Sequence, residues 1–127
     1  MFRYVKFAPI GVADQDRALA FYRDKLGLKL EVDEDYEGKG WRWIEFSMPG
    51  AQTRLLFEKA DGGAASGEPA LVFIVEDVEA TAAELIAKGV DFTQPPKPAP
   101  WDSREYFALF RDSEGNLLQI GARRAAL

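Results

Sequence analysis

Hydrophobic and polar positions follow the same order twice along this chain. Between Asp14 and Gly27, and again between Asp77 and Gly89, apolar residues recur at the three- and four-residue spacing of a helix. An aspartate at the start of each stretch can accept hydrogen bonds from the first helical turn, and the glycine after each stretch is a common helix end. The two stretches are offset by almost the same number of residues at both ends. This indicates a duplicated unit.

Short extended runs surround each predicted helix. In the first half they are Tyr4–Val12, Leu28–Val32, Trp41–Met48 and Thr53–Glu58; in the second half they are Ala70–Val75, Val90–Phe92, Tyr106–Arg111 and Asn116–Gly121. The order predicts an α+β fold of two tandem βαβββ modules, residues 1–60 and 69–127, within one structural domain. Small and flexible residues predict a linker at 61–68, and four prolines predict a stiff surface loop at 94–100.

Alternation within the hairpins predicts which strand residues face the helix. The expected helix side holds Ile44, Phe46, Leu55 and Phe57 in the first module, and Phe107, Leu109, Leu118 and Ile120 in the second. The opposite face then carries Trp41, Trp43, Glu45, Arg54, Leu56 and Glu58 in the first module, and Tyr106, Ala108, Phe110, Leu117 and Gln119 in the second. A face so rich in aromatic side chains is expected to cover a ligand or a partner, because exposing them to water is unfavourable.

The amino-acid composition excludes several kinds of catalytic group, metal ligand and binding partner. The 127 residues include no cysteine and no histidine, so thiolate catalysis, disulfides and the commonest metal ligand are excluded. A net charge of −5 would repel nucleic acid and mildly favours a neutral or cationic partner. No apolar run is long enough to span a membrane, and the first ten residues lack the features of a signal peptide. We therefore expect a cytoplasmic protein without nucleic-acid or membrane partners.

Two motifs resemble a known family. Val12–Leu28 contains an aspartate cap followed by a Phe-Tyr-x-x-x-Leu-Gly helix end, and Phe107–Ile120 contains Asp-Ser-Glu-Gly-Asn in a hairpin. Both resemble the vicinal oxygen chelate superfamily, which comprises glyoxalases, bleomycin-resistance proteins and dioxygenases, and the resemblance covers essentially the whole chain. It implies a curved mixed sheet around a shared cavity and a homodimer. Relatives range from isomerases and dioxygenases to non-catalytic antibiotic-binding proteins, so the resemblance is specific for fold and not for activity.

The resemblance also implies where a metal would be held. Metal-dependent relatives place one ligand on the first and one on the last strand of each module, which corresponds to Phe7, Leu56, Leu71 and Gln119. Three of these side chains have no lone pair to offer a metal. We therefore expect no metal centre of the family type and no cofactor. A Mg²⁺ or Mn²⁺ ion displaced toward Glu45, Glu58 and Gln119 is an open alternative.

The candidate site residues each have more than one interpretation. Glu45, Arg54 and Glu58 could form a cross-strand ion pair or recognise a ligand, with one glutamate acting as a base. Gln119 is interpreted as a hydrogen-bonding group for a ligand or water. The expected apolar cavity wall is Phe7, Leu56, Leu71 and Phe73. The aromatic residues that could line a ligand cup or a dimer interface are Trp41, Trp43, Trp101, Tyr106 and Phe110.

Three functions follow from these candidates. The favoured hypothesis is a metal-free protein that binds a small aromatic or cationic molecule, as in antibiotic sequestration or sensing. The alternative is a lyase- or isomerase-like enzyme in which Glu45 or Glu58 moves a proton next to a carbonyl, with Arg54 or Gln119 stabilising the oxyanion. The third is an interaction module whose aromatic face is consumed by dimerisation.

Overall fold

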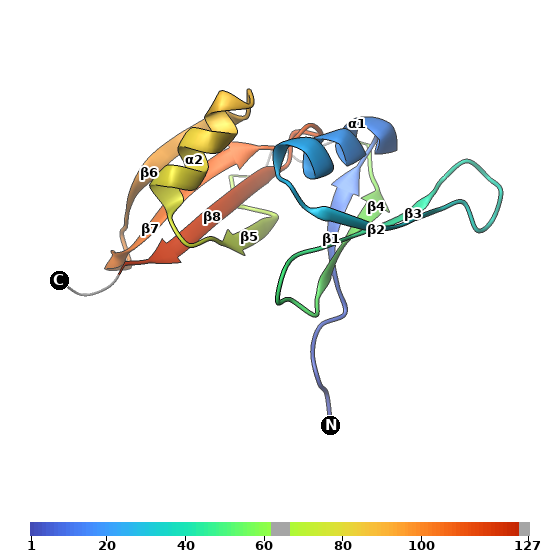
Figure 1. Ribbon diagram of the computed structural model, residues 1–127, viewed down its shortest axis with the longest axis horizontal. Coiled ribbons are helices and arrows are strands. Elements are labelled where there is room, and N and C mark those ends of the chain that lie inside the picture. Colours follow the sequence, from blue (N-terminus) through green and yellow to red (C-terminus); the bar gives the residue numbers. More distant parts are fainter. Residues whose placement is uncertain (62–66, 125–127) are drawn as a thin grey trace. The chain divides into compact units, whose positions relative to one another are not determined.

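The computed structural model describes residues 1–61 and 67–124, and the chain divides into two compact units, Met1–Gly63 and Ala64–Leu127 (Figure 1). The division falls within the predicted linker at 61–68, of which residues 62–66 lie outside the described residues. Each unit has one four-stranded mixed sheet and its own helix.

The element order confirms the βαβββ pattern in both units. Unit 1 consists of β1 (Phe7–Val12), α1 (Gln15–Ala20), the π-helix η1 (Phe21–Lys25), β2 (Lys29–Glu34), β3 (Trp43–Ser47) and β4 (Arg54–Lys59). Unit 2 consists of β5 (Leu71–Ile74), α2 (Val78–Ala87), β6 (Asp91–Ala99), β7 (Asp102–Arg111) and β8 (Leu117–Arg123). The sheets have the equivalent orders β1-β4-β3-β2 and β5-β8-β7-β6, and in each the first strand is parallel to the last.

The predicted caps are confirmed, and the first helix changes type halfway. The carboxylates of Asp14 and Asp77 accept hydrogen bonds from the backbone N–H groups of Arg17 and Ala80, each at 3.0 Å. The expected single helix in unit 1 becomes a π-helix at Phe21, where the N–H of Leu26 donates to the Phe21 carbonyl at 3.1 Å. The wider turn lets two consecutive aromatic residues, Phe21 and Tyr22, both be buried.

Aromatic packing fixes which face of the unit 1 sheet the helix covers. The fully buried ring of Tyr22 lies 6.1 Å from the Phe46 ring and 5.5 Å from the Phe57 ring, centroid to centroid. Ile44 and Leu55 are buried on the same side. The predicted helix side of unit 1 is therefore confirmed. Its opposite face carries Phe7, Trp43, Glu45, Arg54 and Leu56.

In unit 2 the predicted facing of β7 is wrong. Ala108 pairs with Ile120 and Phe110 pairs with Leu118, and directly paired residues share a face. Phe110 is 1% exposed and its ring lies 5.2 Å from that of Phe92, so it belongs to the core against α2. By the same alternation Tyr106 lies on the helix side, while Phe107 and Leu109 lie on the other. The physical reason is that β7 carries apolar residues at consecutive positions. Polar and apolar residues do not alternate there, so the sequence does not show which side chains face the helix.

The same correction applies to β5. Leu71 pairs with Leu118 and Phe73 pairs with Ile120, so both lie on the side of α2 rather than on the expected cavity wall. Val72 and Ile74 point to the opposite face and are exposed. All four residues of this strand are apolar, so the sequence again contains no facing signal.

The proline-rich segment 94–100 is also not the loop that its composition predicts. Residues up to Ala99 belong to β6, which pairs with β7 at the edge of the sheet. The pairing register shifts three times along this strand. Proline lacks a backbone donor, so a proline-rich strand fits an edge position with irregular pairing.

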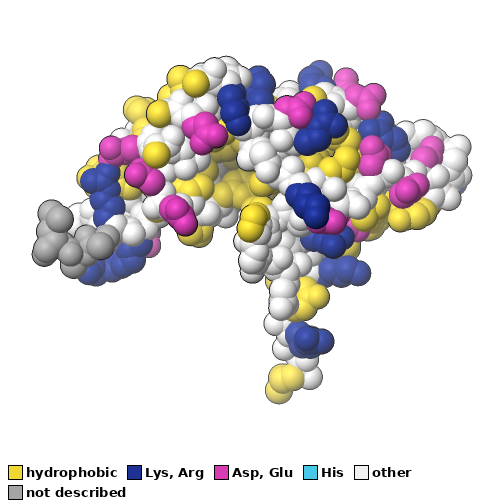
Figure 2. Space-filling model, in the orientation of Figure 1, with side chains coloured by type: hydrophobic (Ala, Val, Ile, Leu, Met, Phe, Trp, Pro, Cys, Tyr) yellow, Lys and Arg dark blue, Asp and Glu magenta, His cyan; other side chains and the backbone are white. Residues whose placement is uncertain are grey.

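Charged side chains of both signs are interspersed over the face shown in Figure 2. No helix within the described residues is long and apolar enough to cross a membrane.

Phe110→Ala tests the corrected facing. We expect it to lower the free energy of unfolding by about 3–5 kcal/mol, because it empties a core position. Leu109→Ala, on the half-buried opposite face, should cost roughly 1–2 kcal/mol. Urea unfolding followed by circular dichroism measures both variants. A loss for Phe110→Ala no larger than that for Leu109→Ala would contradict the corrected facing.

Candidate functional site

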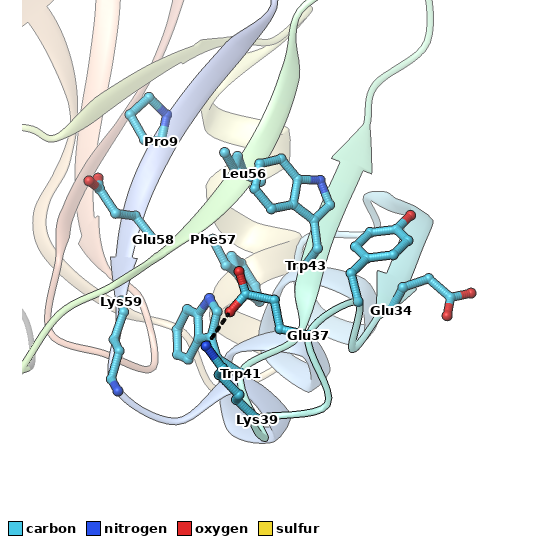
Figure 3. A pocket seen from close by; sticks show the side chains of 11 residues that line it. Pro9, Glu34, Glu37, Lys39, Trp41, Trp43, Leu56, Phe57, Glu58 and Lys59 are labelled. Atoms are coloured by element: carbon cyan, nitrogen blue, oxygen red, sulfur yellow. Dashed lines mark ion pairs between the residues drawn. The ribbon is translucent and has the colours of Figure 1, made fainter.

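A pocket of about 410 Å³ opens on the face of unit 1 that the helix leaves uncovered (Figure 3). Its aromatic walls are Tyr36, Trp41 and Trp43, and its apolar lining includes Leu56 and Pro9. Tyr36 and Trp41 come from the loop between β2 and β3, whereas Trp43 begins β3. Trp43 is 40% exposed, which is unusual for so large an apolar ring.

The rim of the pocket carries more negative than positive side chains. Glu34, Glu37 and Glu58 line it together with two lysines. The ammonium of Lys39 pairs with Glu37 at 3.6 Å, and that of Lys59 lies 6.0 Å from the centroid of the Trp41 ring. The second separation is at the outer limit of a cation–π contact, so the Trp41 ring face has only a weakly held cation. A flat molecule with positive charge suits such a pocket.

Glu45 connects the aromatic wall to the sheet beneath it. It is only 9% exposed; its Oε2 accepts the indole N–H of Trp43 at 2.7 Å and its Oε1 accepts from Arg54 Nη1 at 3.0 Å. Trp43 is held from another side by the ring of Phe7, 5.9 Å away edge-on. Each oxygen of Glu45 therefore accepts a hydrogen bond from a side-chain donor. The expected cross-strand ion pair thus joins Arg54 to Glu45, and this carboxylate fixes Trp43 in place.

Glu58, the other predicted base, has different surroundings. It lies exposed at the end of β4, and it has no hydrogen-bond or ion-pair partner among residues 1–61 and 67–124. Its carboxylate is therefore available to contact a molecule that binds in the pocket.

The loop that carries Tyr36 and Trp41 is tied down by side chains outside the pocket. The carboxylate of Asp35 accepts from the backbone N–H groups of Lys39 and Gly40 at 3.2 and 3.0 Å. Gly38 and Gly40 have φ angles of +66° and +90°, which side-chain-bearing residues rarely adopt. The loop therefore turns back on itself at a fixed position instead of trailing into water.

Gln15 holds the other end of this loop. Its side-chain amide donates to the carbonyl of Arg42 at 2.6 Å and accepts from the N–H of Arg42 at 2.8 Å. Gln15 is buried in the helix, and its side chain thus pairs with the Arg42 backbone as a neighbouring strand would. The guanidinium of Arg42 then binds Asp33 and Asp16, each at 2.8 Å. The hydrogen bonds that Arg42 donates, to Asp33 first and then to Asp16, raise the pKa of Arg42 above its ordinary value, so it stays charged. Since Arg42 lies between Trp41 and Trp43, these contacts hold the stretch of backbone that carries both rings.

The pocket gathers only part of the predicted site. Trp41, Trp43, Leu56 and Glu58 line it directly, and Phe7, Glu45 and Arg54 lie beside it on the same face of unit 1. Their role in binding stays a prediction.

The remaining predicted residues belong to unit 2. Gln119 pairs with Val72 and Leu109 on the face away from α2. The exposed indole of Trp101 lies 5.5 Å from the ring of Phe107 and donates to Glu105 at 2.7 Å. Leu71, Phe73, Tyr106 and Phe110 lie on the helix side, so the facing argument no longer supports them as ligand-binding residues.

Several pocket residues were not predicted from the sequence: Pro9, Glu34, Tyr36, Glu37, Lys39 and Lys59. Tyr36, Glu37 and Lys39 lie in a charged, glycine-containing loop without periodicity, which resembles an ordinary solvated turn, whereas Pro9, Glu34 and Lys59 lie on strands. Gln15 was also missed because a glutamine in a first helical turn resembles a surface residue. A signal for Tyr36 was that it is an aromatic residue in the same charged loop as Trp41.

The positions where relatives hold a metal do not fit one in this chain. Phe7 and Leu56 lie on the uncovered face of unit 1 and offer no lone pair. On β5 the uncovered face carries Val72 rather than Leu71, and valine offers none either. Within the described ranges, no three Asp, Glu, His or Cys side chains gather as a metal site would require.

Gln15→Ala tests the support of the loop. Removing both bonds leaves the half-buried backbone N–H and carbonyl of Arg42 without their Gln15 partner, which should lower the free energy of unfolding by about 1–2 kcal/mol. Hydrogen exchange should accelerate in residues 35–42 more than in β8. The exposed Gln52→Ala is the matched control. Unchanged exchange in the loop would show that Gln15 does not hold it.

Comparisons with known proteins agree with this geometry. A family model described as the Glyoxalase/Bleomycin resistance protein/Dioxygenase superfamily matches residues 3–120. The uncharacterized protein YurT of Bacillus subtilis is 38% identical, over 87% of this chain and 92% of its own length.

Solved structures show the same fold. A member of this superfamily from Sphaerobacter thermophilus is 28% identical and superposes with a TM-score of 0.82, covering 96% of this chain and 98% of that one. TnmS3, an antibiotic binding protein from Streptomyces sp. CB03234, is also 28% identical, with a TM-score of 0.80 and coverage of 96% and 97%. The chain therefore belongs to the glyoxalase/bleomycin resistance protein/dioxygenase superfamily.

Proposed function

We propose that this chain is a metal-free member of its family that binds a flat aromatic molecule, neutral or cationic, in the pocket of unit 1. The observation that carries the proposal is the combination of three aromatic side chains with a surplus of carboxylates around one hollow. Flat aromatic ligands stack on such rings, and positive charge on the ligand is attracted to both the ring faces and the carboxylates. The antibiotic binding protein TnmS3 has the same fold, which supports a binding role of the sequestering or sensing kind.

The fixed position of the rings also favours binding. The ring of Trp43 is held by Glu45 and Phe7, and the backbone next to Trp41 is held by the contacts of Arg42 with Gln15. A pocket that is already ordered loses less conformational entropy on binding than a mobile one.

The binding proposal is tested with 9-aminoacridine, a flat aromatic cation. Isothermal titration calorimetry should detect binding, and Trp41→Ala or Trp43→Ala should each weaken it about tenfold, equivalent to ~1.4 kcal/mol. Ile86→Ala, an exposed residue of α2, is the control with unchanged affinity. Equal affinity in the two tryptophan variants and the wild type would contradict the proposed pocket.

The three tryptophans also allow the ligand to be located. Each gives one indole N–H signal in a two-dimensional ¹H–¹⁵N spectrum. The signals of Trp41 and Trp43 should shift on titration. A Trp101 signal that shifts equally, together with an equal loss of affinity in Trp101→Ala, would place the binding site outside the unit 1 pocket.

A second candidate function is proton transfer next to a carbonyl, and Glu58 is the observation that favours it. Its carboxylate meets the pocket without an internal partner among the described residues, whereas Glu45 is held by two donors. A base needs a free lone pair, so Glu58 is the better of the two predicted bases. If the chain turns over a bound carbonyl compound, Glu58→Gln should abolish turnover and leave binding intact. Unchanged turnover in that variant would exclude this mechanism.

The homodimer and the cytoplasmic location stay part of the proposal. The family resemblance supports the first, and sedimentation velocity measures it directly.

A further inference from the structure

A second hollow lies on the same uncovered face of unit 1 and has a different character. It measures about 570 Å³, and its charged lining consists of Lys6, Arg54 and Glu45. Tyr4 and Gln52 add polar groups at its edge. Whereas the aromatic pocket has a surplus of carboxylates, this hollow has a surplus of cations.

The positive charge in this hollow is only partly neutralised. Arg54 donates one of its five N–H groups to Glu45. The other oxygen of Glu45 accepts from the indole of Trp43, and no ion pair joins Glu45 to Lys6 among the described residues. The ammonium of Lys6 lies 5.2 Å from the centroid of the Phe7 ring and has no ion pair among the described residues. Two cations therefore face this hollow with one shared anion.

The neighbouring Glu31 interacts with Arg54 and with Lys29, and it does not pair with Lys6 among the described residues. Its carboxylate accepts the hydroxyl of Ser47 at 2.7 Å and pairs with Lys29 at 3.6 Å. The hydrogen bond from Ser47 is the main cause that lowers the pKa of Glu31, with Lys29 and Arg54 contributing. Glu31 thus has its own cation, and Lys6 keeps its charge for a group from outside.

The two hollows are joined by one row of side chains on the sheet. Arg54 and Leu56 are alternate residues of β4, about 6.7 Å apart along the strand. Leu56 lines the aromatic pocket and Arg54 lines the second hollow. Trp43 lines the first, and its N–H is bonded to Glu45 in the wall of the second. A flat molecule lying over Leu56 and Trp43 can therefore extend a substituent toward Arg54 and Lys6.

We propose that the second hollow is an anion subsite, and that it receives an acidic substituent, such as a carboxylate, of the aromatic ligand. This inference rests on the proposed binding function and narrows the ligand class to molecules whose flat aromatic part is neutral or cationic and whose substituent is acidic. Arg54 supplies directed N–H donors for the carboxylate, and Lys6 supplies a mobile charge.

The test compares two probes that differ only in charge, 2-naphthylacetate and 2-naphthylacetamide. By calorimetry at low salt, the acetate should bind at least about tenfold more tightly, a difference of ~1.4 kcal/mol. Lys6→Gln should remove most of this preference and leave the affinity for the amide unchanged. Lys88→Gln, which changes the charge equally but lies in unit 2, is the control with the wild-type preference.

Sodium acetate alone provides the second measurement. An acetate ion that binds Arg54 and Lys6 should shift the indole N–H signal of Trp43, because that group shares Glu45 with Arg54. The signal of Trp101, whose indole is bonded to Glu105, should not move.

The outcomes separate the two proposals. Equal affinity for both naphthyl probes, with no effect of Lys6→Gln, would overturn the anion subsite and leave the aromatic pocket standing. If neither naphthyl probe nor 9-aminoacridine binds but acetate shifts Trp43, the anion subsite is supported and the aromatic pocket is overturned. If no probe binds and no signal shifts, both are overturned.

Discussion

The packing of Tyr22 against Phe46 and Phe57 determines which face of the unit 1 sheet is covered by the helix and which is left for other contacts. Because strand side chains alternate between two faces, placing the helix on one face leaves the other uncovered. The π-turn at Phe21 supports this packing, since it buries two consecutive aromatic residues against one surface. The uncovered face then carries large aromatic and charged side chains that no helix protects. The proposed ligand would cover these side chains.

The uncovered face is itself highly ordered. Glu45 is buried and hydrogen-bonded to both Trp43 and Arg54. It therefore links the aromatic pocket to the second hollow. The loop above is fixed by the backbone contacts of Gln15 with Arg42. None of these contacts requires a ligand. The pocket is therefore preorganised, which favours binding of rigid, flat molecules over adaptable ones.

Local signals made much of the fold predictable. Helix caps and the duplicated element order depend on residues close in sequence, and both were predicted correctly. Facing was readable in unit 1, where polar and apolar residues alternate, but not at Phe110, whose strand is apolar on both faces. Half of the candidate site was predictable, because Trp43, Glu45 and Arg54 lie on regular strands. The loop residue Tyr36 and the buried Gln15 were not, because their roles depend on contacts between segments far apart in sequence.

Family membership determines the fold, and the side chains on that fold determine which metal or ligand it can bind. Apolar Phe7 and Leu56 stand where relatives carry metal ligands, so the account rests on an organic ligand and no metal. Native mass spectrometry of the gently purified protein tests this most directly, because it weighs metal and organic adducts together. The account predicts a metal-free chain that carries an organic adduct, and loss of that adduct in a Trp41→Ala/Trp43→Ala variant. A stoichiometric divalent metal bound to the native chain would contradict it.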